Sequence, residues 1–221
     1  MEIPKGVMDQ IDKTISALNK KKFAPDPIAG KHFSKITSVM SSAYKRHGFI
    51  IERATLESVK ANPRFEAWED KAFAVSTAAD SIVNDFMNEP IKAINAQVPY
   101  EDPGPRSLQI DLAAYEIETK AINLYEVKRG SGLHDAGKRR QILRDLLCME
   151  LLAKSYGESK GYEVTKSRAY IIFYYGKCSI KEPFALTSDD LNAHFGFPIK
   201  EGIEAANALF KKRLFEILTG Q

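Results

Sequence analysis

The stretch SLQIDLAAYEIETKAINLYEVKRG, residues 107–130, carries the strongest indication of the fold of this chain. It contains two apolar runs, residues 107–115 and 121–127, which are joined through residues 117–120. Apolar runs of this length that are bounded by turn signals are typical of β-strands. The stretch therefore predicts two neighbouring strands of one sheet.

Charged residues stand at specific places in these two strands. Asp111 lies inside the first run, although aspartate is depleted from strand interiors, and Glu126 and Lys128 lie at the end of the second run. Strand side chains alternate between faces, so Glu126 and Lys128 share one face and Val127 lies on the other. We expect the two acids and the lysine to point to one spot. The alternatives are a turn acid at a strand end for Asp111 and an exposed ion pair for Glu126 and Lys128.

The residues that follow continue an alternating pattern. A glycine-rich segment at residues 129–132 precedes a predicted helix over residues 136–155, which carries a stripe of leucines. The apolar run AYIIFYY, residues 169–175, predicts a central strand, and its aromatic residues are more simply buried than available for base stacking. A last helix is predicted over residues 199–218.

The first hundred residues are predicted to be mostly helical. Helical spacing of apolar residues occurs over residues 7–20, and a second helix starts at Ser34, is interrupted at Gly48 and resumes up to Asn62. A third helical stretch is expected over residues 66–88.

This order of elements predicts an α/β (α+β) fold with a small mixed β-sheet flanked by helices. Residues 1–98 are expected to form a mostly helical N-terminal part that packs on a core formed by residues 99–221, as one compact domain overall. The length of 221 residues suits a single domain.

Composition narrows the function classes further. The chain has 32 Lys and Arg residues against 29 Asp and Glu residues, a formal net charge of +3, which excludes a histone-like DNA binder but not a DNA enzyme. Two cysteines, Cys148 and Cys178, match no zinc spacing and form no disulfide framework. No apolar run has the length of a membrane span or the features of a secretory signal, so we expect a cytoplasmic protein with no membrane partner.

The expected constellation suits phosphodiester hydrolysis. Asp111 and Glu126 can hold Mg²⁺, a hard cation that prefers oxygen ligands, and the backbone carbonyl of Val127 can add another oxygen. A bound Mg²⁺ acts as a Lewis acid and lowers the pKa of a bound water. Lys128 can orient the attacking water or place positive charge beside the developing oxyanion. Asp111, Glu126 and Lys128 are thus the candidate catalytic residues.

The pattern of Asp111, Glu126 and Lys128 on two strands, followed by a helix and a strand, resembles the PD-(D/E)xK nuclease superfamily, and most of all type II restriction endonucleases. The resemblance covers about residues 100–176. Upstream, Gly48 and Glu52 are similar to the Gly-x-x-x-Glu helix of many restriction enzymes, which implies that Glu52 approaches the metal. A solvated helix face is the alternative for Glu52. The resemblance also implies products with 5′-phosphate and 3′-hydroxyl ends.

The sequence departs from the family pattern at two places. Residue 110 is Ile rather than proline. The helix after the second acid carries Gln141 but has Asp145 where an exonuclease branch of the superfamily has tyrosine. That exonuclease branch is therefore disfavoured.

Basic residues just after the motif are candidates for DNA binding. Phosphate contacts supply much of the binding free energy on DNA. A solvated charged helix face is the alternative for the helix residues, and Asp135 is expected to cap that helix. The candidates are Arg129, His134, Lys138, Arg139, Arg140 and Arg144.

Taken together, the sequence leads us to expect a Mg²⁺-dependent, sequence-specific endonuclease of double-stranded DNA, of the type II restriction kind. Palindromic sites are matched by two-fold proteins, so a homodimer is expected. The rivals are another nuclease of the superfamily, for repair, junction resolution or transposition, a non-catalytic DNA-binding protein, and a small-molecule enzyme of unrelated fold. No P-loop, GxGxxG or Gly-x-Ser-x-Gly motif supports the last of these.

Overall fold

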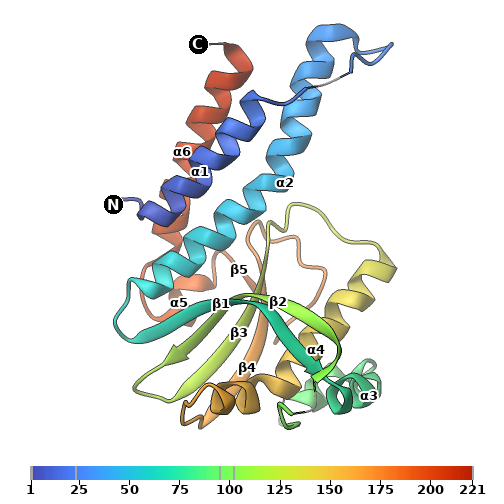
Figure 1. Cartoon of the computed structure of the whole chain (residues 1–221), viewed down its shortest axis with the longest axis vertical. Helices are drawn as coiled ribbons and strands as arrows, with labels where there is room; N and C mark the ends of the chain where they lie inside the picture. Colours follow the sequence, from blue (N-terminus) through green and yellow to red (C-terminus); the bar gives the residue numbers. More distant parts are fainter. Residues whose placement is uncertain (1, 23, 95, 102, 221) are drawn as a thin grey trace.

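A computed structural model describes residues 2–22, 24–94, 96–101 and 103–220 of the chain (Figure 1). The described residues form helices on both sides of a single sheet. The elements in chain order are α1 (Lys5–Asn19), α2 (Gly30–Lys60), β1 (Phe65–Ser76), α3 (Thr77–Phe86), the 3-10 helix η1 (Pro90–Ala93), β2 (Pro103–Glu116), β3 (Ala121–Lys128), α4 (Ala136–Ser159), β4 (Lys166–Phe173), β5 (Ala185–Thr187), α5 (Leu191–Phe195) and α6 (Ile199–Thr219).

The five strands form one mixed sheet in the order β1-β2-β3-β4-β5. The pairs β1–β2 and β2–β3 are antiparallel, whereas β3–β4 and β4–β5 are parallel. Parallel neighbours need a long crossover, which α4 supplies between β3 and β4. The predicted α/β class, with a small mixed sheet flanked by helices, is confirmed.

The sheet separates two apolar clusters. Helices α3 and α4 cover one face, and α1, α2 and α6 form a helical bundle that covers the other and extends beyond the sheet (Figure 1). Strand β3 divides its side chains between them: Ile122 and Leu124 pack with α4, and Tyr125 and Val127 pack with the bundle. This alternation confirms the period-two pattern on which the site prediction depends.

The helix expected over residues 66–88 is wrong in its first half. Residues Phe65–Ser76 form β1, which pairs along β2 from Phe65↔Glu116 to Ser76↔Pro103. The helix starts only at Thr77, where the Ser76 hydroxyl caps it by accepting a hydrogen bond from the Ala79 N–H. Apolar spacing in the second half of the segment fitted a helix, but in the first half pairing with a strand some forty residues away determined the structure.

The interruption expected at Gly48 is also wrong. Helix α2 runs without a break from Gly30 to Lys60. A glycine inside a helix costs only about 1 kcal/mol relative to alanine. The buried stripe on both sides of it, which includes Val39, Ile50 and Val59, offsets that cost.

The other predicted elements are confirmed within a few residues. Strand β2 starts before residue 107 and β4 spans Lys166–Phe173 rather than residues 169–175. Among the described residues, no helix is long and apolar enough to cross a membrane.

Candidate active site

The site begins where β2 and β3 separate. The last backbone pair between these strands toward this end is Leu112↔Tyr125. One residue further, the Asp111 carboxylate takes the place of a backbone acceptor: its Oδ2 accepts a hydrogen bond from the Val127 N–H at 2.7 Å. Its Oδ1 accepts another from Gln109 Nε2 at 3.1 Å. Asp111 is only 9% exposed, so its orientation is fixed.

Glu126 and Lys128 lie on one face of β3, as predicted. Their side chains form an ion pair with an Nζ–Oε1 distance of 2.5 Å. Burial favours the neutral amine of Lys128, but the nearby carboxylates of Glu126, Asp111 and Glu52 outweigh this effect and raise the pKa of Lys128. Lys128 therefore remains charged beside the acids.

Helix α2 brings Glu52 to the same place. Burial, followed by the negative charges of Asp111 and Glu126, raises the pKa of Glu52 to about 8. Burial likewise raises the pKa of Asp111 to about 6, against the lowering effect of its hydrogen bond from Val127. The carboxyl groups thus repel one another, and a cation that binds between them would relieve this repulsion.

A pocket of about 300 Å³ joins these side chains. All four predicted side chains line it: Glu52 from α2, Asp111 from β2, and Glu126 and Lys128 from β3. Further residues that were not predicted from the sequence also line the pocket. Their spacing gave a signal for two of them, because Phe49 is one helical turn before Glu52 and Gln109 is two strand positions before Asp111. The missed residues include Phe49, Gln109, Asp145 and Met149.

The donor set fits a hard divalent cation, because it consists of carboxylate oxygens. Across the part of the chain that the structure describes, no three His, Cys, Asp or Glu side chains lie together as a ready-made ligand cluster. Asp111 is instead occupied by its two hydrogen bonds, and Glu126 by Lys128. The carboxyl groups of Glu52, Asp111 and Glu126 share a pocket, but Asp111 and Glu126 are engaged by separate partners.

The predicted DNA contact Arg129 is packed between aromatic rings. Its guanidinium lies 4.7 Å from the ring centroid of Tyr44 and 5.3 Å from that of Tyr175. Its Nε–H donates to His47 Nδ1 at 3.2 Å, which fixes His47 as the neutral tautomer that donates from Nε2 to Asn207. Burial lowers the pKa of His47, which agrees with this arrangement. Arg129 faces the bundle, away from the acids.

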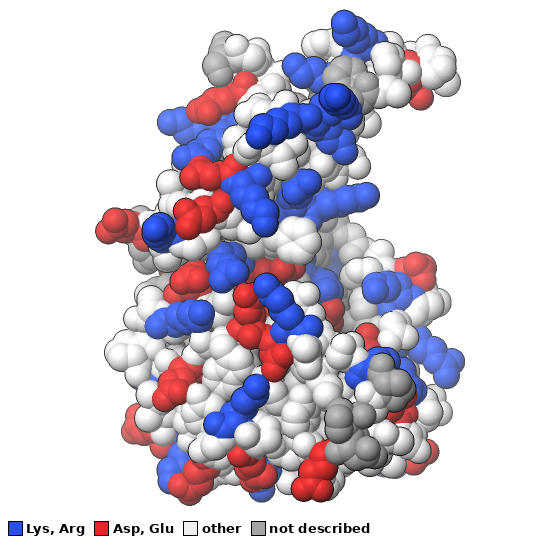
Figure 2. All heavy atoms as spheres, viewed as in Figure 1, with Lys and Arg blue, Asp and Glu red and all other residues white. Residues whose placement is uncertain are grey.

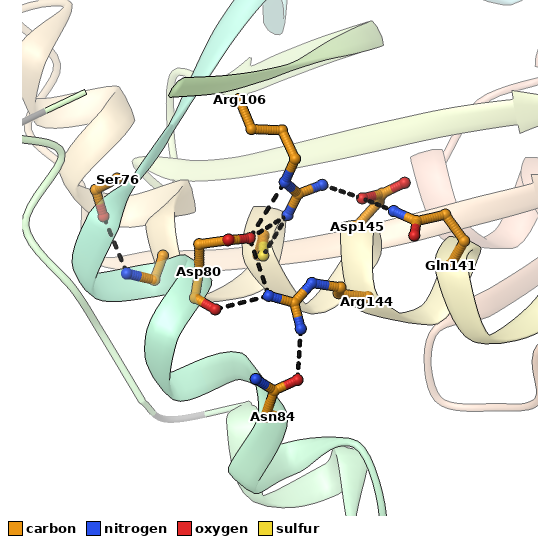
Figure 3. A network of polar contacts seen from close by, with 9 residues as sticks. Ser76, Asp80, Asn84, Arg106, Gln141, Arg144 and Asp145 are labelled. Carbon is orange, nitrogen blue, oxygen red and sulfur yellow. Dashed lines mark hydrogen bonds and ion pairs between the residues drawn. The ribbon is translucent and has the colours of Figure 1, made fainter. Parts of the chain in front are cut away.

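Arg144 is held in a network of ion pairs between β2, α3 and α4 (Figure 3). It donates to the Asp80 backbone carbonyl at 2.7 Å and to Asn84, and it pairs with the Asp80 carboxylate at 3.1 Å. Arg106 joins the same carboxylate to Asp145, which also accepts from Gln141. Arg144 is therefore engaged within the protein, and the network positions Asp145 on the wall of the pocket.

The remaining basic candidates lie at or before the start of α4. Asp135 caps this helix as predicted, accepting from the Lys138 N–H at 2.9 Å. His134 Nδ1 and its backbone N–H both contact the Ser179 hydroxyl. The three residues that stay exposed are Lys138, Arg139 and Arg140.

Comparison of the chain with protein-family models, with curated proteins and with solved structures finds no match. The assignment of a function rests on the residues of the pocket.

Proposed function

We propose that the protein is a Mg²⁺-dependent endonuclease of double-stranded DNA, of the restriction type. One observation carries the proposal: Asp111, Glu126, Lys128 and Glu52, the residues that resemble the PD-(D/E)xK pattern, line one pocket. The mixed sheet supports it, because the two acids and the lysine stand at the diverging ends of adjacent strands.

Each side chain has a distinct role in the proposed reaction. Asp111 and Glu126, with Glu52 and the Val127 carbonyl, would hold Mg²⁺. When bound, the cation supplies Lewis acidity and a more acidic water. Lys128 keeps a positive charge at the pocket, where it orients water and stabilises the negative charge that develops on the phosphate.

The proposal includes sequence-specific cleavage by a homodimer, to 5′-phosphate and 3′-hydroxyl ends. A palindromic DNA site has two-fold symmetry, which a dimer with one pocket per protomer matches. The exposed residues Lys138, Arg139 and Arg140 are available for phosphate contacts on this DNA. Light scattering of the purified protein with and without DNA measures its oligomeric state.

Plasmid cleavage tests the function. The native protein, Lys128→Ala and Asp111→Asn are incubated with plasmid and MgCl₂, beside Lys166→Ala, which removes an exposed lysine from the far end of the neighbouring strand. Discrete fragments from the native protein and the control, lost in the two site variants, are expected. Random nicking that both site variants lose indicates a repair or junction nuclease. Intact plasmid with every divalent metal, together with a gel shift, indicates a non-catalytic DNA-binding protein.

A further inference from the structure

A second hollow adjoins the pocket on the side of the helical bundle. Its volume is about 290 Å³, and it lies between α1, α2 and β1. It shares four lining residues with the pocket of the proposed active site: Phe49, Glu52, Gln109 and Asp111. The two hollows therefore adjoin each other at these four residues, and together they are called the groove below.

Basic side chains line the part of the groove that is remote from Glu126. They come from three elements: Lys13 from α1, Arg46 and Arg53 from α2, and Lys71 from β1. Arg53 and Lys71 pair with the Glu69 carboxylate at 3.6 and 3.5 Å. For Lys13 and Arg46, no acidic partner lies within 4 Å among the residues that the structure describes. These two cations are free to pair with an anion from outside.

The charge of the whole chain is distributed in the same way. Residues 1–49 contain nine Lys and Arg residues against four Asp and Glu residues, a formal net charge of +5. Residues 50–204 contain 20 against 24, a net charge of −4. Figure 2 shows one face of the molecule. On it, Lys and Arg gather over the helical end, and Asp and Glu lie at the centre where the helices meet the sheet.

Phe49 stands where the two hollows meet. It is 52% exposed, although it is a large apolar side chain on a well-formed helix. Positions 46, 49, 53 and 56 of α2 share one helical face, and all four line the groove. The face therefore offers a cation on each side of an exposed aromatic ring, and the ring also borders the carboxyl pocket.

We propose that this groove binds the DNA strand on one side of the cleaved phosphate, with backbone phosphates on Lys13 and Arg46 and a nucleoside against the ring of Phe49. The carboxylates repel uncompensated phosphates, so the strand follows the basic wall until it reaches the pocket. This inference rests on the proposed function, and it assigns the main electrostatic contact to the bundle rather than to the start of α4.

The test is DNA binding measured separately from cleavage. The Lys128→Ala protein is the reference, and it is compared with the same protein carrying Lys13→Gln/Arg46→Gln. Both are titrated against a fluorescent duplex in MgCl₂ at several salt concentrations. The matched control is Lys211→Gln/Lys212→Gln, which removes the same charge from α6. Lys211 lines a different cavity with Ala43 and His47, on the opposite face of α2. Circular dichroism and thermal unfolding check that the variants fold.

We expect the Lys13→Gln/Arg46→Gln substitutions to weaken binding tenfold or more. They should reduce the salt slope of log Kd by about 2, since each phosphate contact contributes about 0.9. The control pair should change Kd by less than about twofold. Phe49→Leu should weaken binding several-fold with an unchanged salt slope, because stacking is not ionic.

Equal effects of the two charge pairs, or no effect of the Lys13/Arg46 pair, overturn the groove assignment. A protein that binds no duplex overturns it as well. Failure of the proposed function gives a different result: the native protein binds the duplex through Lys13 and Arg46, but leaves plasmid intact with every divalent metal.

Discussion

The carboxylate of Asp111 accepts a hydrogen bond from the backbone N–H of Val127, and so joins the first acid of the site to the strand that carries the second. This contact replaces a backbone pair at the point where β2 and β3 diverge. Asp111 thus has a structural task in addition to its proposed role in metal binding, and suitable variants separate the two.

Asp111→Asn should remove the proposed DNA cleavage while it preserves stability. The amide oxygen can still accept from the Val127 N–H. Burial raises the pKa of Asp111 to about 6, so above pH 6 the substitution removes a charge that is unfavourably desolvated. Asp111→Ala leaves the buried Val127 N–H without a partner, and should lower the free energy of unfolding by about 1–3 kcal/mol. Urea unfolding at pH 8 measures both values. Equal stability of the two variants would contradict the structural role of the hydrogen bond.

Gly130→Ala should be strongly destabilising. Gly130 has a φ of +65°, and a Cβ there would lie 2.8 Å from the backbone carbon of Phe173 in β4. We expect a loss of about 2 kcal/mol or more, from the left-handed backbone and the clash together. Gly132→Ala is the matched control in the same segment, because a Cβ at Gly132 meets nothing within 4 Å. Comparable urea midpoints for the two variants would show that the segment is freer than this backbone conformation implies.

Arg129→Ala should reduce stability more than DNA affinity. The guanidinium stacks on Tyr44 and Tyr175 and donates to His47, and these contacts together are worth about 2 kcal/mol. Arg139→Ala, at an exposed position, should change stability by less than about 0.5 kcal/mol. Thermal unfolding and duplex binding of the two variants check this. A stable Arg129→Ala protein with impaired binding would restore Arg129 as a phosphate contact.

The free energy of unfolding should decrease as the pH rises, because of Glu150. This residue of α4 is buried, and burial raises its pKa to about 7, despite the N–H of Ala169 and the nearby Arg168. Between about pH 4.5 and 7 the unfolded chain releases this proton while the folded protein retains it, so the free energy of unfolding falls over that range. Above pH 7 this contribution is constant.

Glu150→Gln removes that titration. The difference in unfolding free energy between variant and native protein should shift in favour of the variant by roughly 2–3 kcal/mol from pH 4.5 to pH 8. Urea unfolding at both pH values measures it. A difference that is independent of pH would show that Glu150 ionises normally in the folded protein.

The sequence predicted the part of the site that depends on local periodicity. Alternation in β3 correctly placed Glu126 and Lys128 on one face, and the turn and strand signals placed Asp111 beside them. The same alternation puts Arg129 on the other face, yet its sequence position beside Lys128 suggested a phosphate contact. The period-two rule, applied one residue further, predicts its packing against the bundle.

Contacts between distant segments could not be predicted in this way. Arg144 and Asp80 are 64 residues apart, and nothing in the sequence pairs them. Strand β1 was predicted as helix because the helical spacing of Val75, Ala79 and Ile82 was extended upstream over it, whereas its pairing with β2 is non-local. The cations of the groove were missed for a similar reason, since Lys13 and Lys71 meet only in the folded protein.

The unbroken course of α2 limits where the chain can tolerate insertions and deletions. The helix carries Arg46, Phe49 and Glu52 on one rod that also packs against α1 and α6. One residue inserted between Arg46 and Glu52 would rotate the two ends relative to each other by about 100°. Glu52 would then leave the pocket, or α2 would lose its apolar contacts with α1 and α6. Insertions that preserve both must keep the helical phase, whereas the segment between α1 and α2 can vary in length without moving Glu52.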